Sequence, residues 1–173
     1  MKKKIIFFDG DGTLWYPKKT KYTTHPVWLY RDKRFKNHAN HLVMTPSALT
    51  TIKKLKRMEI LTIVLSTHPH PPKEADAIIN QKIKHFELSE LFDEVHATRE
   101  HSGSKGEFMV EILKRRKIPK SKALMVGDSY KWDFEPAKEN GIDALLIESE
   151  YEPMKNKVKK TIKKLSDIFT CIS

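Results

Sequence analysis

Short apolar runs alternate with helical patterns along almost the whole chain, and no other feature of the sequence limits the possible folds as much. Apolar runs separated by helices are typical of parallel strands joined by crossover helices. The sequence therefore predicts an α/β protein, a doubly wound three-layer sandwich around a mainly parallel, Rossmann-like sheet. We expect its strands at residues 4–9, 60–66, 94–97, 122–128 and 142–148.

Helices are predicted between these strands from local signals. Ser104 and Glu107 have the spacing of a capping box, which marks the start of a helix. Proline in a first turn indicates the start of two earlier helices. The helix predicted at 152–169 depends on apolar residues at helical spacing in a lysine-rich tail. The expected helices cover 46–58, the segment after Pro71-Pro72, the segment after Ser104, 136–140 and 152–169.

The composition is that of a globular protein without a membrane partner. At 173 residues the chain is long enough for a hydrophobic core, and we expect one domain over 1–173. Hydrophobic residues make up 39% and charged residues 32%, which is typical neither of membrane proteins nor of disordered ones. The N-terminus has no cleavage site of a signal peptide, and Cys171 is the only cysteine. We therefore expect a cytoplasmic protein.

The net charge of +11 is unusual, and much of it lies in a basic and aromatic insert at residues 16–45. This insert holds seven Lys or Arg and five aromatic residues, against one acidic residue. Basic residues interleaved with aromatic ones are typical of surfaces that bind single-stranded nucleic acid. A loop whose Trp15, Trp28 and Tyr30 pack on the core accounts for the pattern equally well, so both interpretations stay open.

Polar residues stand where the predicted strands end. Asp9 and Asp11 follow the first strand, Ser66 ends the second, and Asp128 ends the fourth. Because parallel strands place their carboxyl ends at one edge of the sheet, where α/β proteins bind ligands, we expect these side chains to converge. Three aspartates without histidine or cysteine form an oxygen-only site, which favours Mg²⁺ over zinc.

The residues FFDGDGTL resemble the first motif of the haloacid dehalogenase-like hydrolases, a large family dominated by phosphatases. Ser66 is similar to the family's second motif, Lys105 to its lysine just inside a helix, and GDSYKWD at 127–133 to its fourth motif. The resemblance covers about residues 4–149. Short spacing and the continuation TLWYP look most like the magnesium-dependent members that lack a large cap.

This resemblance implies a Mg²⁺-dependent phosphatase that hydrolyses phosphate monoesters. Asp9 would attack phosphorus and become an aspartyl phosphate, and Asp11 would act as the general acid and base. The metal would be held by the carboxylates of Asp9 and Asp128 and by the backbone carbonyl of Asp11. Groups near the phosphate oxygens would be Ser66, Thr67, the amide of Gly10 and Lys105, with Asp133 supporting Lys105 or a metal-bound water.

Some residues near these motifs have a second interpretation. Gly10 lacks the bulkier side chain of many relatives, which either opens room for a substrate or loosens the turn. Asp133 could instead cap a short helix. His68 and His70 lie in a proline-bounded loop, and we expect exposed histidines there rather than a part of the site.

Residues 16–45 are too few for a usual helical cap, so we expect at most a small flap over an open site. An open site suits large substrates, such as a phosphoprotein or a nucleic-acid end. A phosphorylated small molecule is the other substrate that we expect. One alternative function is a polynucleotide end-phosphatase. Another is a non-catalytic, basic nucleic-acid-binding module on the same fold, against which the intact set of motif residues argues.

Overall fold

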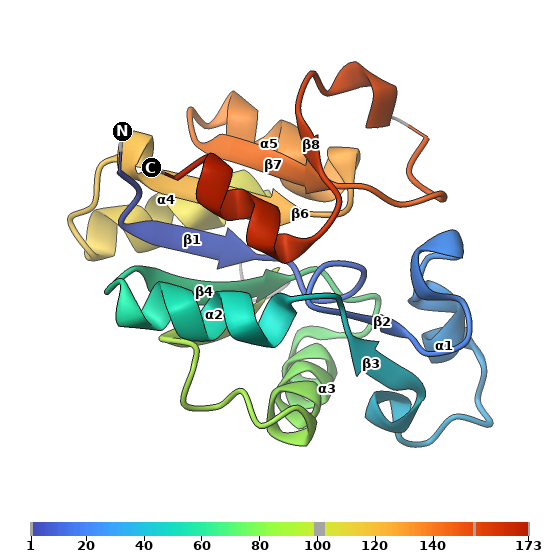
Figure 1. The fold of residues 1–173 in the computed structure, drawn as a ribbon. Coiled ribbons are helices and arrows are strands. Elements are labelled where there is room, and N and C mark those ends of the chain that lie inside the picture. The colour runs from blue at the N-terminus through green and yellow to red at the C-terminus, as the bar shows by residue number, and fades with distance from the viewer. Residues whose placement is uncertain (1, 99–102, 154, 173) are drawn as a thin grey trace.

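A six-stranded parallel sheet forms the centre of the computed structural model, which describes residues 2–98, 103–153 and 155–172 (Figure 1). The strands lie in the order β5-β4-β1-β6-β7-β8, and each pairs in parallel with its neighbours. The predicted α/β class and its five strands are confirmed, and β8 is a further edge strand that the sequence patterns did not predict. The strands are Ile5–Phe8 (β1), Leu61–Ser66 (β4), Glu94–Ala97 (β5), Ala123–Gly127 (β6), Asp143–Ile147 (β7) and Thr161–Ile162 (β8).

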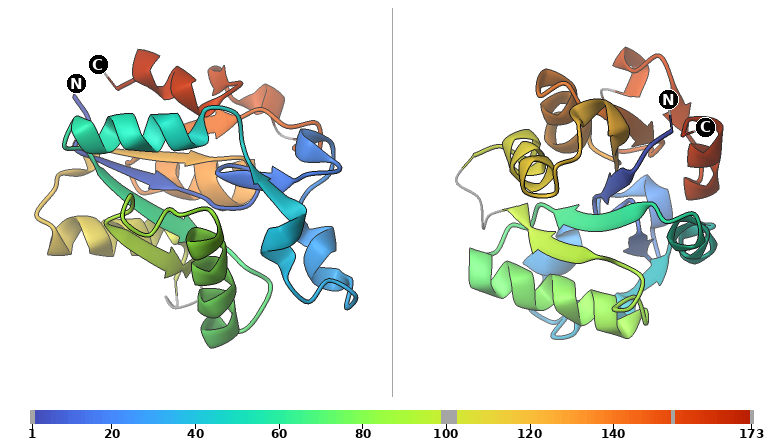
Figure 2. Two further views of the ribbon diagram at one scale, coloured as in Figure 1. Left: turned by 60° about the horizontal axis from the view of Figure 1, so that its bottom comes forward. Right: turned by 90° about the vertical axis from the view of Figure 1, so that its left-hand side faces the viewer.

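Helices cover both faces of this sheet, as the two further views show (Figure 2). Alternate residues of β1 face opposite layers: Ile6 and Phe8 join one apolar cluster, and Ile5 and Phe7 join the other. The first cluster includes residues of α2 (Ala48–Arg57), α3 (Pro72–His85) and the 3-10 helix Leu165–Thr170. The second includes residues of α4 (Lys105–Arg115) and α5 (Glu135–Glu139). The fold is therefore a three-layer sandwich.

The insert after β1 forms a small substructure and no large cap domain within the described part of the chain. The short strands β2 (Trp15–Pro17) and β3 (Leu42–Met44) pair antiparallel and close the insert at its base. Between them lie the helix α1 (Val27–Arg31) and two short 3-10 helices, Lys21–Thr23 and His38–His41. Within the described residues, the helices are too short or too polar to cross a membrane.

The predicted helix over 152–169 is wrong. Its described residues form a 3-10 helix at Lys155–Lys157, the strand β8 and a second 3-10 helix at Leu165–Thr170. Ile162 pairs with Ile147 of β7, and the backbone N–H of Glu148 donates to the carbonyl of Ile162 at 2.9 Å. Ile162 is thus buried by pairing with a distant strand, which local periodicity cannot reveal.

Candidate active site

Three neighbouring strands end at one edge of the sheet in residues that carry polar side chains. Asp9 follows β1 and Asp128 follows β6, while β4 ends in Ser66. β1 pairs with β4 on one side and with β6 on the other, so the three carboxyl ends lie next to one another. This edge is where a parallel α/β sheet binds its ligands.

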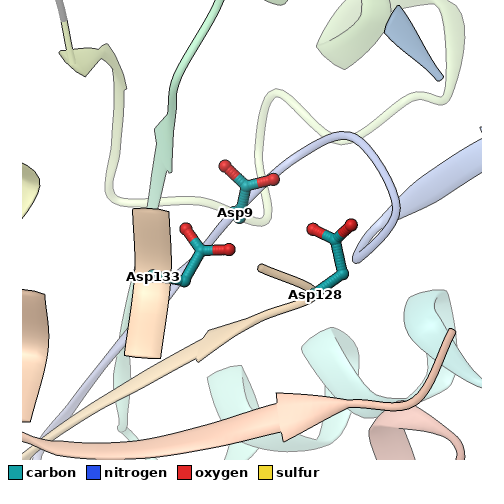
Figure 3. A group of neighbouring side chains, drawn as sticks. All are labelled: Asp9, Asp128 and Asp133. Atoms are coloured by element: carbon teal, nitrogen blue, oxygen red, sulfur yellow. The ribbon is translucent and has the colours of Figure 1, made fainter. Parts of the chain in front are cut away.

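Three carboxylates gather there, those of Asp9, Asp128 and Asp133 (Figure 3). One oxygen of each lies within 4.8 Å of the others, and all three side chains are buried. Burial raises the pKa of Asp9 to about 7, because the opposing effect of Lys105 is too small and Asp133 and Asp11 raise the pKa further. Burial, and then the nearby Asp9 and Asp133, also raise the pKa of Asp128 well above its ordinary value. With all three carboxylates ionised, the group would carry more negative charge than Lys105 offsets, which fits a divalent cation with oxygen ligands.

Lys105, the first residue of α4, reaches two of these carboxylates. Its Nζ lies 2.9 Å from Oδ1 of Asp9 and also forms an ion pair with Asp133. Burial lowers the pKa of Lys105, but Asp133 and Asp9 outweigh this effect and raise the pKa above its ordinary value. The lysine is therefore charged and offsets part of the charge of Asp9 and Asp133.

The start of α4 is fixed by the predicted capping box. The Ser104 hydroxyl accepts from the backbone N–H of Glu107 at 3.2 Å, and the Glu107 carboxylate accepts from the backbone N–H of Ser104 at 2.6 Å. The second oxygen of Asp133 accepts from the backbone N–H of Ser129 at 3.0 Å. Asp133 thus stabilises the turn after β6 and contacts Lys105 at the same time.

Asp128 and the loop after β1 are packed closely. The Tyr151 hydroxyl donates to Oδ2 of Asp128 at 2.6 Å. Gly12 has a φ of +80°, and a Cβ there would come within 2.3 Å of the same oxygen. Only glycine allows this loop to approach Asp128 so closely.

Gly10 has no free space beside it. A Cβ at this position would lie 2.8 Å from the Trp15 ring and 2.9 Å from Oγ of Ser66. The interpretation that Gly10 opens room for a substrate is therefore wrong, because Trp15 and Ser66 fill that room. Thr67 lines the open space near the carboxylates, and its hydroxyl accepts from Thr98 at 3.0 Å. Phosphate binding by Gly10, Ser66 and Thr67 stays a prediction.

The carboxylate of Asp11 lies outside the group of three and is enclosed by donors. Trp15 Nε1 and Lys82 Nζ donate to its Oδ1 at 2.7 Å and 2.9 Å, and the Tyr30 hydroxyl donates to its Oδ2 at 2.5 Å. Burial raises the pKa of Asp11, but Lys82 and Tyr30 outweigh it and lower the pKa below its ordinary value. Asp11 is therefore ionised in this arrangement.

Sequence reasoning missed Lys82 and assigned Tyr30 no role in the site. A signal for Lys82 exists: it lies three residues after Ile79 and seven after Ala75, on the buried stripe of α3. A lysine on such a stripe is rarely buried without a partner. Tyr30 carries no comparable signal, because its contact depends on how α1 folds back over the loop after β1.

A cleft of about 690 Å³ opens beside these residues. The insert contributes His25, Val27 and Tyr30 to its wall, and Trp132, which is 54% exposed, lines it as well. His68 also lines it.

The prediction of an exposed His68 is wrong. His68 is 1% exposed, and the Tyr30 ring lies 4.4 Å from its ring. Burial, and then the nearby Lys82, lower the pKa of His68 to about 3, so its imidazole is neutral. Its Nδ1 lies 3.0 Å from Nδ1 of His70.

Solved structures share this fold at low sequence identity. A HAD phosphatase from Thermococcus onnurineus is 18% identical with a TM-score of 0.71, and the alignment covers 100% of this chain and 98% of that one. A protein described as a predicted phosphoglycolate phosphatase from Haemophilus somnus 129PT is 14% identical with a TM-score of 0.76, covering 100% and 99%. A haloacid dehalogenase-like family protein from Streptococcus pneumoniae is 16% identical with a TM-score of 0.72, covering 99% of each chain.

No curated protein sequence matches the chain significantly. A family model described as haloacid dehalogenase-like hydrolase matches residues 18–147, which is most of the chain. The match begins after Asp9 and Asp11, so these two residues are recognised from their own motif and from the geometry around them. The chain belongs to the haloacid dehalogenase-like hydrolases.

Proposed function

We propose that this protein is a Mg²⁺-dependent phosphatase that hydrolyses phosphate monoesters through a covalent phosphoryl group on Asp9. The observation that carries this proposal is the position of Asp9. Its carboxylate is buried at a sheet edge, paired with Lys105 at 2.9 Å, grouped with Asp128 and Asp133, and open to the cleft. A buried carboxylate between a fixed cation and a metal-binding group is suited to attack a phosphate, whose negative charge would otherwise repel it.

The residues that would hold Mg²⁺ are Asp9, Asp128 and the backbone carbonyl of Asp11. Asp133 belongs to the same group, but its two oxygens already accept from Lys105 and from the Ser129 amide, so we assign it a supporting role. A bound Mg²⁺ supplies positive charge to the phosphate oxygens and removes the repulsion between them and the carboxylates.

The proposed reaction has two steps, and Asp9 and Asp11 act in both. Asp11 is ionised in the free protein, so it takes up a proton, from solvent or from the phosphate monoanion, when the substrate binds. An oxygen of Asp9 then attacks phosphorus, the bond from phosphorus to the ester oxygen breaks, and Asp11 gives its proton to that leaving oxygen. In the second step Asp11 takes a proton from a water molecule, whose oxygen attacks the same phosphorus. The bond to Asp9 then breaks, which releases phosphate and restores the free carboxylate.

Ser66, Thr67 and the Gly10 amide would bind the phosphate oxygens, and Lys105 would offset their charge. Lys105 already contacts the carboxylates of Asp9 and Asp133. The cleft next to Asp9 is large enough for a small phosphate ester.

A polynucleotide end-phosphatase is less favoured by the packing of the insert. Its five aromatic residues are buried or half-buried: Tyr22, Trp28 and Phe35 are partly buried against the core, Tyr16 is 6% exposed, and Tyr30 contacts Asp11. Stacking on single-stranded bases needs exposed rings. The net charge and the exposed ring of Trp132 at the cleft still support nucleic acid as a substrate or partner. A cytoplasmic location remains a prediction from composition.

Hydrolysis of p-nitrophenyl phosphate tests the proposal. Wild-type protein should turn the ester over with Mg²⁺ and not with EDTA, and Asp9→Asn should abolish turnover although it keeps the shape of the side chain. Wild-type protein without turnover on this ester, on sugar phosphates and on phosphorylated oligonucleotides, with several divalent metals, contradicts the proposal.

The same assay separates the alternatives. An end-phosphatase should cleave phosphorylated oligonucleotides faster than small esters at low salt. A binding module should instead bind oligonucleotides tightly, in a salt-sensitive way that Asp9→Asn leaves unchanged, and should show no turnover.

A further inference from the structure

Each of the two aspartates in the loop after β1 forms an ion pair with its own buried lysine. Lys105 lies 2.9 Å from Asp9, and Lys82 lies 2.9 Å from Asp11. Lys105 comes from α4 on one side of the sheet, whereas Lys82 comes from α3, whose apolar residues pack in the cluster on the other side. The family resemblance accounts for Lys105 and says nothing of Lys82.

Lys82 occupies a position where folding alone favours an apolar side chain. It is 1% exposed and shares the buried stripe of α3 with Ala75, Ile79 and Ile83. Taking an ammonium group out of water is costly, and a well-packed apolar side chain often stabilises a protein more than a buried ion pair does. A lysine at this position is therefore better explained by what its nitrogen contacts than by the stability of the helix.

The hydrogen bonds that the structure describes for Lys82 join it to Asp11 and to a second donor of Asp11. Its Nζ donates to Oδ1 of Asp11 and to the Tyr30 hydroxyl, and it lies 4.5 Å from the centre of the Tyr30 ring and 5.6 Å from that of Trp15. Trp15 and Tyr30 are the other two donors to Asp11. Three donors on two oxygens, from the loop itself, the insert and α3, fix the rotation of the Asp11 carboxylate.

From this arrangement we infer that Lys82 and Tyr30 are positioning residues, which hold the carboxylate of Asp11 in the orientation that proton transfer to and from the reacting oxygens requires. The inference rests on the proposed function, in which Asp11 is the general acid and base. Neither residue is assigned a contact with substrate. Their effect passes through Asp11, and this predicts a specific kinetic pattern.

Two variants remove the contacts with little change of shape. Lys82→Met keeps an unbranched side chain of similar length without the charge, and Tyr30→Phe removes one oxygen. The matched control is Lys84→Met, two positions along the same helix, where the lysine is exposed. Tyr30→Phe leaves the buried charges in place, so it keeps the test valid if Lys82→Met lowers the yield of folded protein.

The readout is kcat/KM for esters with different leaving groups. Propyl phosphate needs a proton on its leaving oxygen, whereas dinitrophenyl phosphate has a leaving group that departs as an anion. We expect Lys82→Met to lower kcat/KM for propyl phosphate about ten- to a hundredfold, since displaced supporting groups cost about this much. For dinitrophenyl phosphate the change should stay within about threefold, because general acid catalysis contributes little there.

A double-mutant cycle on p-nitrophenyl phosphate gives the second readout. If Lys82 acts through Asp11, Lys82→Met should cost no further activity once Asp11 is replaced in Asp11→Asn. An equal loss for all three esters that persists in the Asp11→Asn background means a purely structural role and overturns the inference. Unchanged activity of Lys82→Met and Tyr30→Phe on propyl phosphate overturns it as well.

Failure of the proposed function gives a different result. If wild-type protein hydrolyses none of the three esters with Mg²⁺, the phosphatase proposal fails and the positioning role fails with it. If wild-type protein and Lys84→Met are active while the two positioning variants lack the expected pattern, only the inference about Lys82 and Tyr30 fails.

Discussion

Asp9 and Lys105 form a buried ion pair of 2.9 Å, although 96 positions separate them in the chain. Asp9 is held by the end of β1, and Lys105 by the first turn of α4, whose capping box fixes where the helix begins. The same ammonium group contacts Asp133. One lysine therefore offsets charge on the proposed nucleophile and on a neighbouring carboxylate at once.

Replacing this lysine should remove most of the activity of the folded protein. Lys105→Met loses the cation beside Asp9 and leaves two buried carboxylates without it. Loss of one fixed group that stabilises charge in a transition state costs about 10²–10³ in rate, and we expect kcat on p-nitrophenyl phosphate to fall by that amount. Lys114→Met, on the exposed face of the same helix, is the control and should retain wild-type activity. A variant at Lys105 with wild-type kcat would contradict the proposed role.

Mg²⁺ should stabilise the protein more as the pH rises. In the metal-free protein burial raises the pKa of Asp9 to about 7, above its unfolded value of 3.8. The folded state thus holds this proton more tightly, so the stability it contributes is present at low pH and is lost as the pH rises through about 7. Mg²⁺ binds the deprotonated carboxylates, so the increase in Tm on adding Mg²⁺ should be larger at about pH 8 than at about pH 6.

Thermal unfolding at several pH values, with Mg²⁺ and with EDTA, measures this dependence. Asp9→Asn removes the titrating group, so its metal-free stability should change less between these pH values than that of the wild type. A Mg²⁺ effect on Tm that shrinks as the pH rises would show that the metal does not compete with protons for Asp9.

Tyr151 should strengthen Mg²⁺ binding because it orients the carboxylate of Asp128. Its hydroxyl donates to Oδ2 of Asp128 at 2.6 Å and helps to orient that carboxylate. Loss of such a partner typically costs about tenfold or more in metal affinity, so Tyr151→Phe should weaken Mg²⁺ binding by about that factor in titration calorimetry. The control is Tyr130→Phe. The Tyr130 ring stacks on Phe134, and a phenylalanine can keep this contact. Equal Mg²⁺ affinity in both variants would exclude an orienting role for Tyr151.

The central sheet and the convergence of polar residues at its edge could be predicted from the sequence because both depend on local patterns. Branched and aromatic runs indicate strands, and the order of strands and helices indicates parallel pairing. Parallel pairing then places residues such as Asp9 and Asp128 together without any knowledge of their distance in space. The capping box at Ser104 is local as well, and it located Lys105 correctly at the start of α4.

Contacts that depend on distant segments could not be predicted in this way. Ile162 has helical spacing to its neighbours but is buried in β8, because the edge of β7 offers it backbone partners. The spacing of Lys82 to Ile79 and Ala75 could have indicated that it is buried, but its partner Asp11 becomes known only once α3 is docked. Tyr30 reaches Asp11 only because the insert folds back over the loop after β1.

A side chain at Gly10 should lower both stability and activity. A Cβ there would lie 2.8 Å from the Trp15 ring, which is fully buried and stacks on Phe86. Trp15 cannot shift without disturbing the hydrogen bond of 2.7 Å that it donates to Asp11. Overpacking of this kind costs about 1–3 kcal/mol, so Gly10→Ala should lower the free energy of unfolding by that amount in urea titrations.

The matched control separates the stability of the fold from the geometry of the site. Gly141 has a φ of +74° at the end of α5, and a Cβ there would meet only Lys120, at 3.7 Å. Gly141→Ala should therefore cost about 1–2 kcal/mol through backbone strain alone. We expect Gly10→Ala to lose kcat/KM on propyl phosphate as well, because the Trp15 donor moves away from Asp11, and Gly141→Ala to keep it. Equal kcat/KM in two variants of similar stability would show that Trp15 does not orient Asp11.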